Sequence, residues 1–262
     1  SSGVKDELSR HQTLARHCQI AEIAAIISMC GGVSISEKDH YSLKIQTENV
    51  YVARKYFTLL KKAFNIEVEV SIRQGTFSKG SRTYTVAVLN HEDAIRILKA
   101  ARLFNADMEI EEQFSISDNL VIQKTCCRRA FIRGAFLAAG SISDPQKFYH
   151  FEIVCQDEAK AENLRDIIHT FQIDAKIVLR KKSYVVYVKE GAQIVDMLAI
   201  MEANVALMNL ENIRILKEMR NSVNRKVNCE TANINKTVSA AVKQIEDIRL
   251  IKEKTGIHNL NE

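Results

Sequence analysis

Met29-Cys30-Gly31-Gly32 ends one apolar run of this chain, and Leu137-Ala138-Ala139-Gly140 ends another 108 residues later. Both stretches close a run of apolar residues with a glycine. A pattern that recurs at a fixed offset indicates duplicated structural units, and this decides the architecture before any single motif is weighed. We therefore expect two related halves.

The segments that follow each glycine repeat as well. Residues 41–45, Tyr-Ser-Leu-Lys-Ile, align at the same offset with residues 149–153, Tyr-His-Phe-Glu-Ile. Both alternate apolar and polar side chains, which predicts half-buried strands. After short gaps, residues 84–88 align with residues 184–188. Each half therefore predicts the element order αββαββα, and the fold class is α+β.

Composition bounds the class of protein. The chain has 262 residues, 46% of them hydrophobic, and a net charge of +5. That length supports one or two compact domains, and the modest positive charge permits nucleic-acid binding without requiring it. No run approaches the roughly 18 apolar residues of a membrane span, and no signal-peptide pattern is present at the start. We expect a cytoplasmic protein that makes no membrane contact.

The cysteines and histidines predict no metal site. No pair of cysteines has C-x-x-C spacing, and neighbouring positions such as Cys126 and Cys127 point to different faces of a helix. His11 and His17 are six residues apart and also lie on different faces of a helix. We expect reduced packing cysteines, with no metal and no cofactor. The six cysteines are Cys18, Cys30, Cys126, Cys127, Cys155 and Cys229.

One segment concentrates positive charge near the C-terminal end. The segment from Arg214 to Lys243 contains seven basic and two acidic residues, so it carries as much net charge as the whole chain. A solvated helix face and a phosphate-binding surface both fit this pattern. The candidate DNA-binding residues are Arg214, Lys217, Arg220, Arg225, Lys226, Lys236 and Lys243.

Residues 132–140, Ile-Arg-Gly-Ala-Phe-Leu-Ala-Ala-Gly, resemble the LAGLIDADG helix of homing endonucleases, and residues 24–32 are a weaker match. In that family two such helices cross at a pseudo-two-fold axis, and the sheets of the two halves form a saddle for DNA. Small residues let the two helix backbones approach closely. The candidate helix-interface residues are Ala25, Ser28, Gly32, Gly134, Ala138 and Gly140.

The catalytic position of that family lacks its acid in this chain. In active LAGLIDADG nucleases the acidic residue before the final glycine holds a divalent metal, which needs a hard oxygen ligand. With Gly32 aligned to Gly140, the corresponding residues are Gly31 and Ala139. We therefore expect a scaffold without nuclease activity, and no catalytic residue.

The C-terminal part is more specific. Residues 225–237, Arg-Lys-Val-Asn-Cys-Glu-Thr-Ala-Asn-Ile-Asn-Lys-Thr, are similar to the segment that leads into the helix-turn-helix domain of the WhiA family, and residues 4–9 are similar to its N-terminus. The resemblance implies a nucleoid-associated transcription regulator of Gram-positive bacteria, acting in cell division, chromosome segregation or sporulation. It also implies a WhiB-type iron-sulfur partner.

The resemblance gives an expected domain plan. Because the chain ends soon after a predicted helix, we expect most of the helix-turn-helix to be missing, and a monomer that binds DNA weakly. The expected segments are a first LAGLIDADG-like half at 1–107, a second at 108–204, a linker helix to 223 with a basic polar connector to 235, and the start of a helix-turn-helix at 236–262.

Two functions remain open at this point. In the first, the saddle is a platform for a DNA-binding regulator. In the second, the saddle binds a protein partner or the chain's own C-terminal domain, because acids such as Glu67, Glu69 and Glu152 are mixed among the bases of its expected sheet face.

Overall fold

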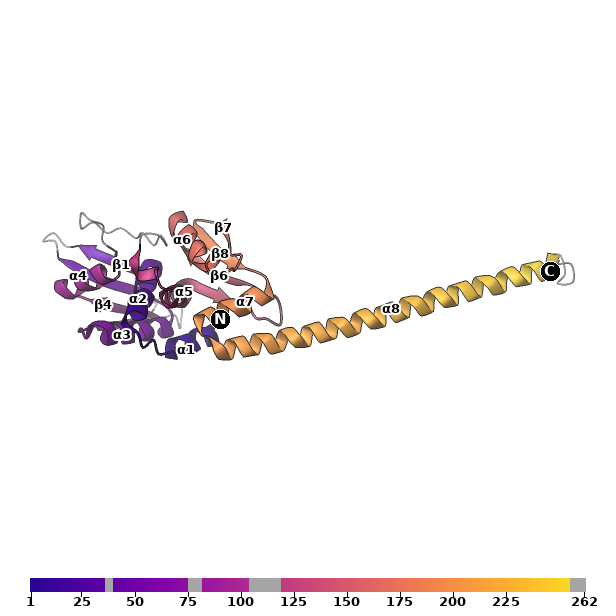
Figure 1. Cartoon of the computed structure of the whole chain (residues 1–262), viewed down its shortest axis with the longest axis horizontal. Coiled ribbons are helices and arrows are strands. Elements are labelled where there is room, and N and C mark those ends of the chain that lie inside the picture. The colour runs from indigo at the N-terminus through magenta and orange to yellow at the C-terminus, as the bar shows by residue number, and fades with distance from the viewer. Residues whose placement is uncertain (36–39, 75–81, 104–118, 255–262) are drawn as a thin grey trace. The chain divides into compact units, whose positions relative to one another are not determined.

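The computed structural model describes residues 1–35, 40–74, 82–103 and 119–254 (Figure 1). It divides into two units, Ser1–Glu211 and Asn212–Glu262. The first unit holds both duplicated halves. The boundary predicted between residues 107 and 108 lies outside the described residues.

Local signals in the sequence set the ends of the first-half helices. The side chain of Asn49 accepts a hydrogen bond from Tyr51 N and starts one helix, which ends at Asn65 in the left-handed conformation (φ 52°). Asn90 starts the next helix in the same way. The elements are α1 (Ser2–Arg10), α2 (Arg16–Cys30), β1 (Gly31–Ile35), β2 (Tyr41–Thr47), α3 (Val50–Phe64), β3 (Glu69–Gln74), β4 (Arg82–Val88) and α4 (His91–Ala100).

The second half repeats this order, which confirms the predicted α+β fold with two αββαββα halves. Each half has an antiparallel four-stranded sheet, with strand order β1-β2-β4-β3 in the first and β5-β6-β8-β7 in the second. The second-half elements are η1 (Leu120–Ile122), α5 (Thr125–Ala139), β5 (Gly140–Ile142), β6 (Phe151–Cys155), α6 (Glu158–His169), β7 (Lys176–Arg180), β8 (Ser183–Val188) and α7 (Gly191–Met201).

Helices α2 and α5 lie side by side between the two sheets (Figure 1). Ile23, Ala24 and Ile26 of α2 are fully buried, as are Ile132 and Ala135 of α5. Both helices are therefore enclosed on nearly every side, which explains why their apolar residues cover several faces rather than one stripe.

Helix α8 (Asn204–Lys254) is a single helix of 51 residues. Its first turn belongs to the first unit, where the carboxylate of Glu7 accepts hydrogen bonds from Val205 N (2.7 Å) and Ala206 N (3.0 Å). The predicted break at 224–235 is wrong. That stretch is polar but has neither glycine nor proline, the two residues that carry the large helix penalties.

Candidate functional site

The two central helices touch at a pair of equivalent small residues. A Cβ atom added to Gly134 would lie 2.6 Å from the carbonyl oxygen of Glu22 and 3.0 Å from Cβ of Ala25. Gly134 and Ala25 occupy the same position of α5 and α2, ten residues into each helix. The helices therefore cross where neither has a large side chain.

The other four predicted interface residues lie farther along the helix pair or beyond it. Ser28 is buried in α2, where its carbonyl oxygen accepts from Lys160 Nζ of the second half at 3.1 Å. Ala138 is half-buried in α5, Gly140 is buried at the start of β5, and Gly32 is exposed in β1.

The structure shifts the alignment of the halves by one residue at this helix. Gly31 and Gly140 both follow directly on their helices, and both begin strands that pair through equivalent isoleucines, Ile45 and Ile153. The offset here is thus 109, and the residue before the glycine in the first half is Cys30 rather than Gly31. The earlier alignment was wrong because two consecutive glycines offer either register.

The corrected pair, Cys30 and Ala139, still has no carboxylate. Burial raises the pKa of the Cys30 thiol to about 11, against an opposing effect of the Lys5 charge, and the thiol donates to Ile26 O at 3.4 Å. A protonated thiol and a methyl group offer no oxygen ligand to a hard divalent cation. The two positions therefore lack the chemistry of metal-assisted phosphodiester hydrolysis.

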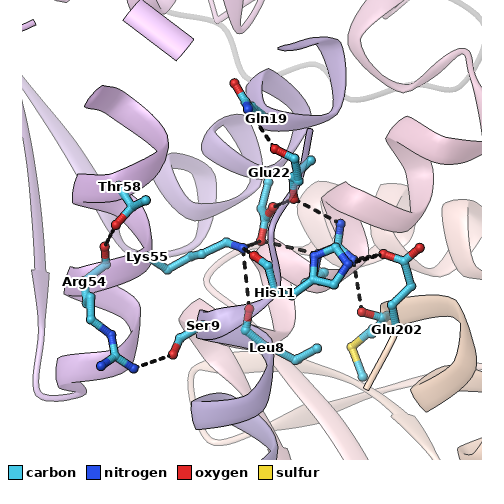
Figure 2. Close-up of polar contacts among 12 residues, drawn as sticks. Leu8, Ser9, His11, Gln19, Glu22, Arg54, Lys55, Thr58 and Glu202 are labelled. Carbon is cyan, nitrogen blue, oxygen red and sulfur yellow. Dashed lines mark hydrogen bonds and ion pairs between the residues drawn. The ribbon is translucent and has the colours of Figure 1, made fainter. Parts of the chain in front are cut away.

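A buried ionic cluster joins the two halves close to this helix crossing (Figure 2). Lys55 Nζ lies 3.3 Å and Arg133 Nε 3.4 Å from Oε1 of Glu22. The Glu22 side chain is 0% exposed, and each cation is 3% exposed. Burial lowers the pKa of Lys55, and the charge of Glu22 opposes that shift. One carboxylate thus pairs with a cation from each half.

The C-terminal end of α7 also contacts the cluster. Arg133 donates to Met201 O at 3.1 Å and pairs with the carboxylate of Glu202, which also lies 2.9 Å from His11 Nε2. Burial and the Arg133 charge both lower the pKa of His11, and the Glu202 charge opposes them. The buried cations are thus held by backbone oxygens and carboxylates together, as a buried charge requires.

The two sheet faces differ in charge at equivalent positions. Lys44 pairs with Gly32 and Ala87 in the first sheet, and Glu152 pairs with Ser141 and Tyr187 at the same place in the second. A base in one half is therefore replaced by an acid in the other. At this position the two charges offset one another, so the pair adds no net positive charge to the sheet faces.

Glu152 also forms an ion pair with a neighbouring arginine. Arg180 pairs with both carboxylate oxygens, at 3.0 and 3.3 Å, and His150 Nε2 and Ser141 Oγ lie 3.1 Å away. Burial alone would raise the pKa of Glu152, but the hydrogen bonds from Arg180, His150 and Ser141 lower it below its ordinary value. The Arg180 guanidinium is therefore already paired within the protein.

All seven predicted DNA-binding residues lie on α8, within the second unit. Arg214, Arg225 and Lys236 are eleven residues apart, which is about three turns, so they share one face of the helix. Lys243 follows two turns later on the same face. Arg214 and Lys217 are half-buried, whereas Arg220, Arg225, Lys226, Lys236 and Lys243 are exposed.

Comparisons with known proteins agree with this arrangement. Three family models match the chain: the WhiA N-terminal LAGLIDADG-like domain at residues 16–104, the WhiA LAGLIDADG-like domain at 128–220 and the WhiA C-terminal HTH domain at 223–262. The probable cell division protein WhiA of Lachnoclostridium phytofermentans is 54% identical over the whole chain, which covers 83% of that protein. The chain belongs to the WhiA family.

Other WhiA proteins are also similar. The probable cell division protein WhiA of Alkaliphilus oremlandii is 46% identical, and the chain covers 82% of it. Among solved structures, a full-length DUF199/WhiA from Thermatoga maritima superposes with a TM-score of 0.71 at 22% identity, covering 100% of this chain and 82% of that one. The N-terminal LAGLIDADG domain of a DUF199/WhiA gives 0.58 at 19% identity, covering 76% and 88%. These two structures support the fold alone.

The WhiA match corrects one expectation. Sequence alone predicted that most of the helix-turn-helix is missing, but residues 223–262 match the WhiA HTH model. Arg225, Lys226, Lys236 and Lys243 fall inside that range. Arg214, Lys217 and Arg220 fall inside the preceding LAGLIDADG-like match instead.

The helix that enters the WhiA HTH range also carries an apolar stripe. Its members recur at intervals of three, four or seven residues, and each is more than half exposed. This spacing is typical of a helix that packs against another element. The stripe consists of Leu216, Met219, Val223, Val227, Ile234, Val238, Ile245 and Ile248.

A side-chain group that sequence reasoning missed lies elsewhere in this WhiA chain. His17 and Cys18 of α2 lie beside Cys126 and Cys127 of α5. The expectation that Cys126 and Cys127 point apart is wrong, because their sulfurs lie within 4.8 Å of each other at the first turn of α5. The missed signal was the corrected offset of 109, which makes the two pairs equivalent.

No helix among the described residues is long and apolar enough to cross a membrane.

Proposed function

We propose that this chain is a DNA-binding regulator of cell division that does not cleave DNA. The observation that carries the proposal is the set of exposed bases on α8 within the range that matches the WhiA helix-turn-helix. The name of its relatives, probable cell division protein WhiA, supports the cellular role. Exposed Lys and Arg along one helix face are the groups that contact phosphates.

The non-catalytic part of the proposal rests on the ends of the paired helices. Cys30 and Ala139 stand where a LAGLIDADG nuclease would need acids, so the LAGLIDADG-like halves would serve as a platform. The proposed domains remain 1–107, 108–204, 205–235 and 236–262. A WhiB-type partner, a monomeric state, a cytoplasmic, nucleoid-associated location and roles in chromosome segregation or sporulation stay predictions.

A variant of α8 that lacks two positive charges tests the proposed DNA contact. Replacing Arg225 and Lys236 by glutamine should weaken binding of the full chain to a labelled duplex. Each lost phosphate contact should reduce the slope of log affinity against log salt by about 0.9, so the slope should fall by about 2. Fluorescence anisotropy at several salt concentrations measures this slope.

The matched control changes charge without touching α8. Lys61→Gln with Lys99→Gln removes two exposed bases from α3 and α4 and should leave the slope unchanged. Equal losses in the two double variants would assign the effect to net charge and contradict the proposed contact. The bound DNA should stay intact with magnesium present, and nicking that needs the protein would contradict a non-catalytic scaffold.

Glu152→Gln tests whether the sheet face also contacts DNA. The change removes one negative charge and frees Arg180. Because the proposed DNA contact lies on α8 rather than on the sheets, we expect the affinity and salt slope to match the wild type. Glu162→Gln, an exposed change on α6, is the control of equal charge. Tighter binding by Glu152→Gln alone would show that the sheet face takes part.

A further inference from the structure

Four metal-ligating side chains meet at the beginning of the central helix pair. Nδ1 of His17 lies 3.2 Å from Sγ of Cys18, 3.2 Å from Sγ of Cys127 and 4.0 Å from Sγ of Cys126. The four donor atoms all lie within 4.8 Å of one another. No other such group of three or more His, Cys, Asp or Glu side chains occurs among the described residues.

The duplication of the fold explains how these residues meet. His17 and Cys18 are the second and third residues of α2, and Cys126 and Cys127 are the second and third residues of α5. The helices pack side by side, so equivalent positions near their first turns face one another. This end lies about 18 Å along α2 from Cys30, at the helix rise of 1.5 Å per residue.

We propose that His17, Cys18, Cys126 and Cys127 form a tetrahedral zinc site that links the two halves. Three sulfurs and one imidazole are a ligand set typical of structural zinc. Bond lengths of about 2.3 Å to sulfur and 2.0 Å to nitrogen place tetrahedral N and S about 3.5 Å apart. The observed distances of 3.2, 3.2 and 4.0 Å bracket that separation.

The surroundings of the site suit a cation and give it access. Cys18 and Cys127 are buried, whereas His17 and Cys126 are exposed, so an ion could enter from solvent. Neither helix has a side-chain cap at its first turn. The positive ends of two helices would therefore stabilise the thiolates that a metal requires.

Burial disfavours the charged form of the two buried thiols. Burial, with smaller effects of Cys126 and Cys127, raises the pKa of Cys18 to about 12. Burial and the neighbouring Cys126 also raise the pKa of Cys127, although Cys18 and Lys124 act in the opposite direction. Zinc would reverse this state, since a coordinating thiol loses its proton to solvent when the metal binds.

The choice of zinc follows from the donors. Thiolate and imidazole are softer ligands than the oxygens that magnesium and calcium prefer, and four protein donors leave no open coordination position. Such a closed site is structural. It would fix the first turn of α2 to that of α5, whereas Gly134 and the ionic cluster hold the helix pair farther along.

Zinc content and cobalt spectroscopy of the full chain test the proposal. The chain is expressed without a histidine tag and purified under a phosphine reductant without chelator. We expect one zinc ion per chain by inductively coupled plasma mass spectrometry. After removal of zinc, added Co²⁺ should give the visible bands of tetrahedral thiolate coordination, and zinc should displace them.

Single substitutions separate the site from general thiol effects. Cys126→Ser changes an exposed ligand and should fold, as far-ultraviolet circular dichroism can show. It should lose zinc and bind Co²⁺ at least about tenfold more weakly, which is the loss typical of disturbing even an outer-shell partner. Cys229→Ser changes an exposed cysteine on α8 and should keep both signals.

Two results would overturn the proposal. The first is a wild-type chain with no more zinc than Cys126→Ser and no thiolate bands with Co²⁺. The second is a disulfide between Cys18 and Cys127 in the chain isolated without reductant, together with failure of the reduced chain to bind zinc. The second result would identify a redox pair in place of a metal site.

Discussion

Glu22→Ala should destabilise the first unit by about 3–5 kcal/mol, because it leaves the buried cations Lys55 and Arg133 without their shared carboxylate. These side chains are at most 3% exposed, so bulk solvent does not replace the lost partner. For a unit of 211 residues this corresponds to a fall in melting temperature of roughly 6–20 °C. Differential scanning fluorimetry of the full chain measures it.

Two further variants locate the origin of this loss. Glu162→Ala removes an exposed glutamate from α6 and should change stability by less than about 0.5 kcal/mol. Glu22→Ala combined with Lys55→Met and Arg133→Met removes all three charges and should recover part of the loss, since apolar groups of similar volume can replace a buried ion cluster. A Glu22→Ala chain as stable as Glu162→Ala would show that the cluster contributes nothing.

Gly134→Ala should also destabilise the first unit, by about 1–3 kcal/mol. In an isolated helix the same change would stabilise by about 1 kcal/mol. Here the new Cβ would meet the carbonyl oxygen of Glu22 at 2.6 Å, and a backbone atom in a buried helix cannot turn aside. The steric effect therefore decides the sign. Scanning fluorimetry measures this change too.

Gly32→Ala is the matched control. A Cβ at Gly32 would have Lys44 O at 3.9 Å as its nearest neighbour, which is an ordinary contact, so this variant should stay close to the wild type. Ala25→Gly added to Gly134→Ala relieves only the 3.0 Å contact and should not restore stability. A stabilised Gly134→Ala chain would mean that the helices are not in close contact there.

The duplicated pattern was enough to predict the fold because it is a property of many residues at once. Alternating strands at 41–45 and 149–153 and the helix-final glycines each indicated the same order of elements. An error of one residue, Gly31 taken for Cys30, left that order unchanged. Local patterns that agree with one another make a fold predictable even where a single alignment is wrong.

The contacts between the halves were less predictable. The members of the ionic cluster, Glu22, Lys55 and Arg133, are far apart in sequence. Nothing in the sequence distinguishes them from ordinary polar residues, because their contacts depend on how the helices pack. The grouping of His17 with Cys126 depends on the same packing. The continuous α8 was missed for another reason, since its polar stretch was taken for a break although it contains neither glycine nor proline.

Lys44 and Glu152 make the two sheets of the duplicated scaffold differ in charge at one equivalent position. Gene duplication produces halves that a two-fold symmetric ligand cannot tell apart, but a base on one sheet and an acid on the other remove that equivalence. At this position an approaching charged group meets a base on the first sheet and an acid, already paired with Arg180, on the second. A ligand whose two ends differ in charge would thus have one preferred orientation, and reversing it would cost electrostatic energy.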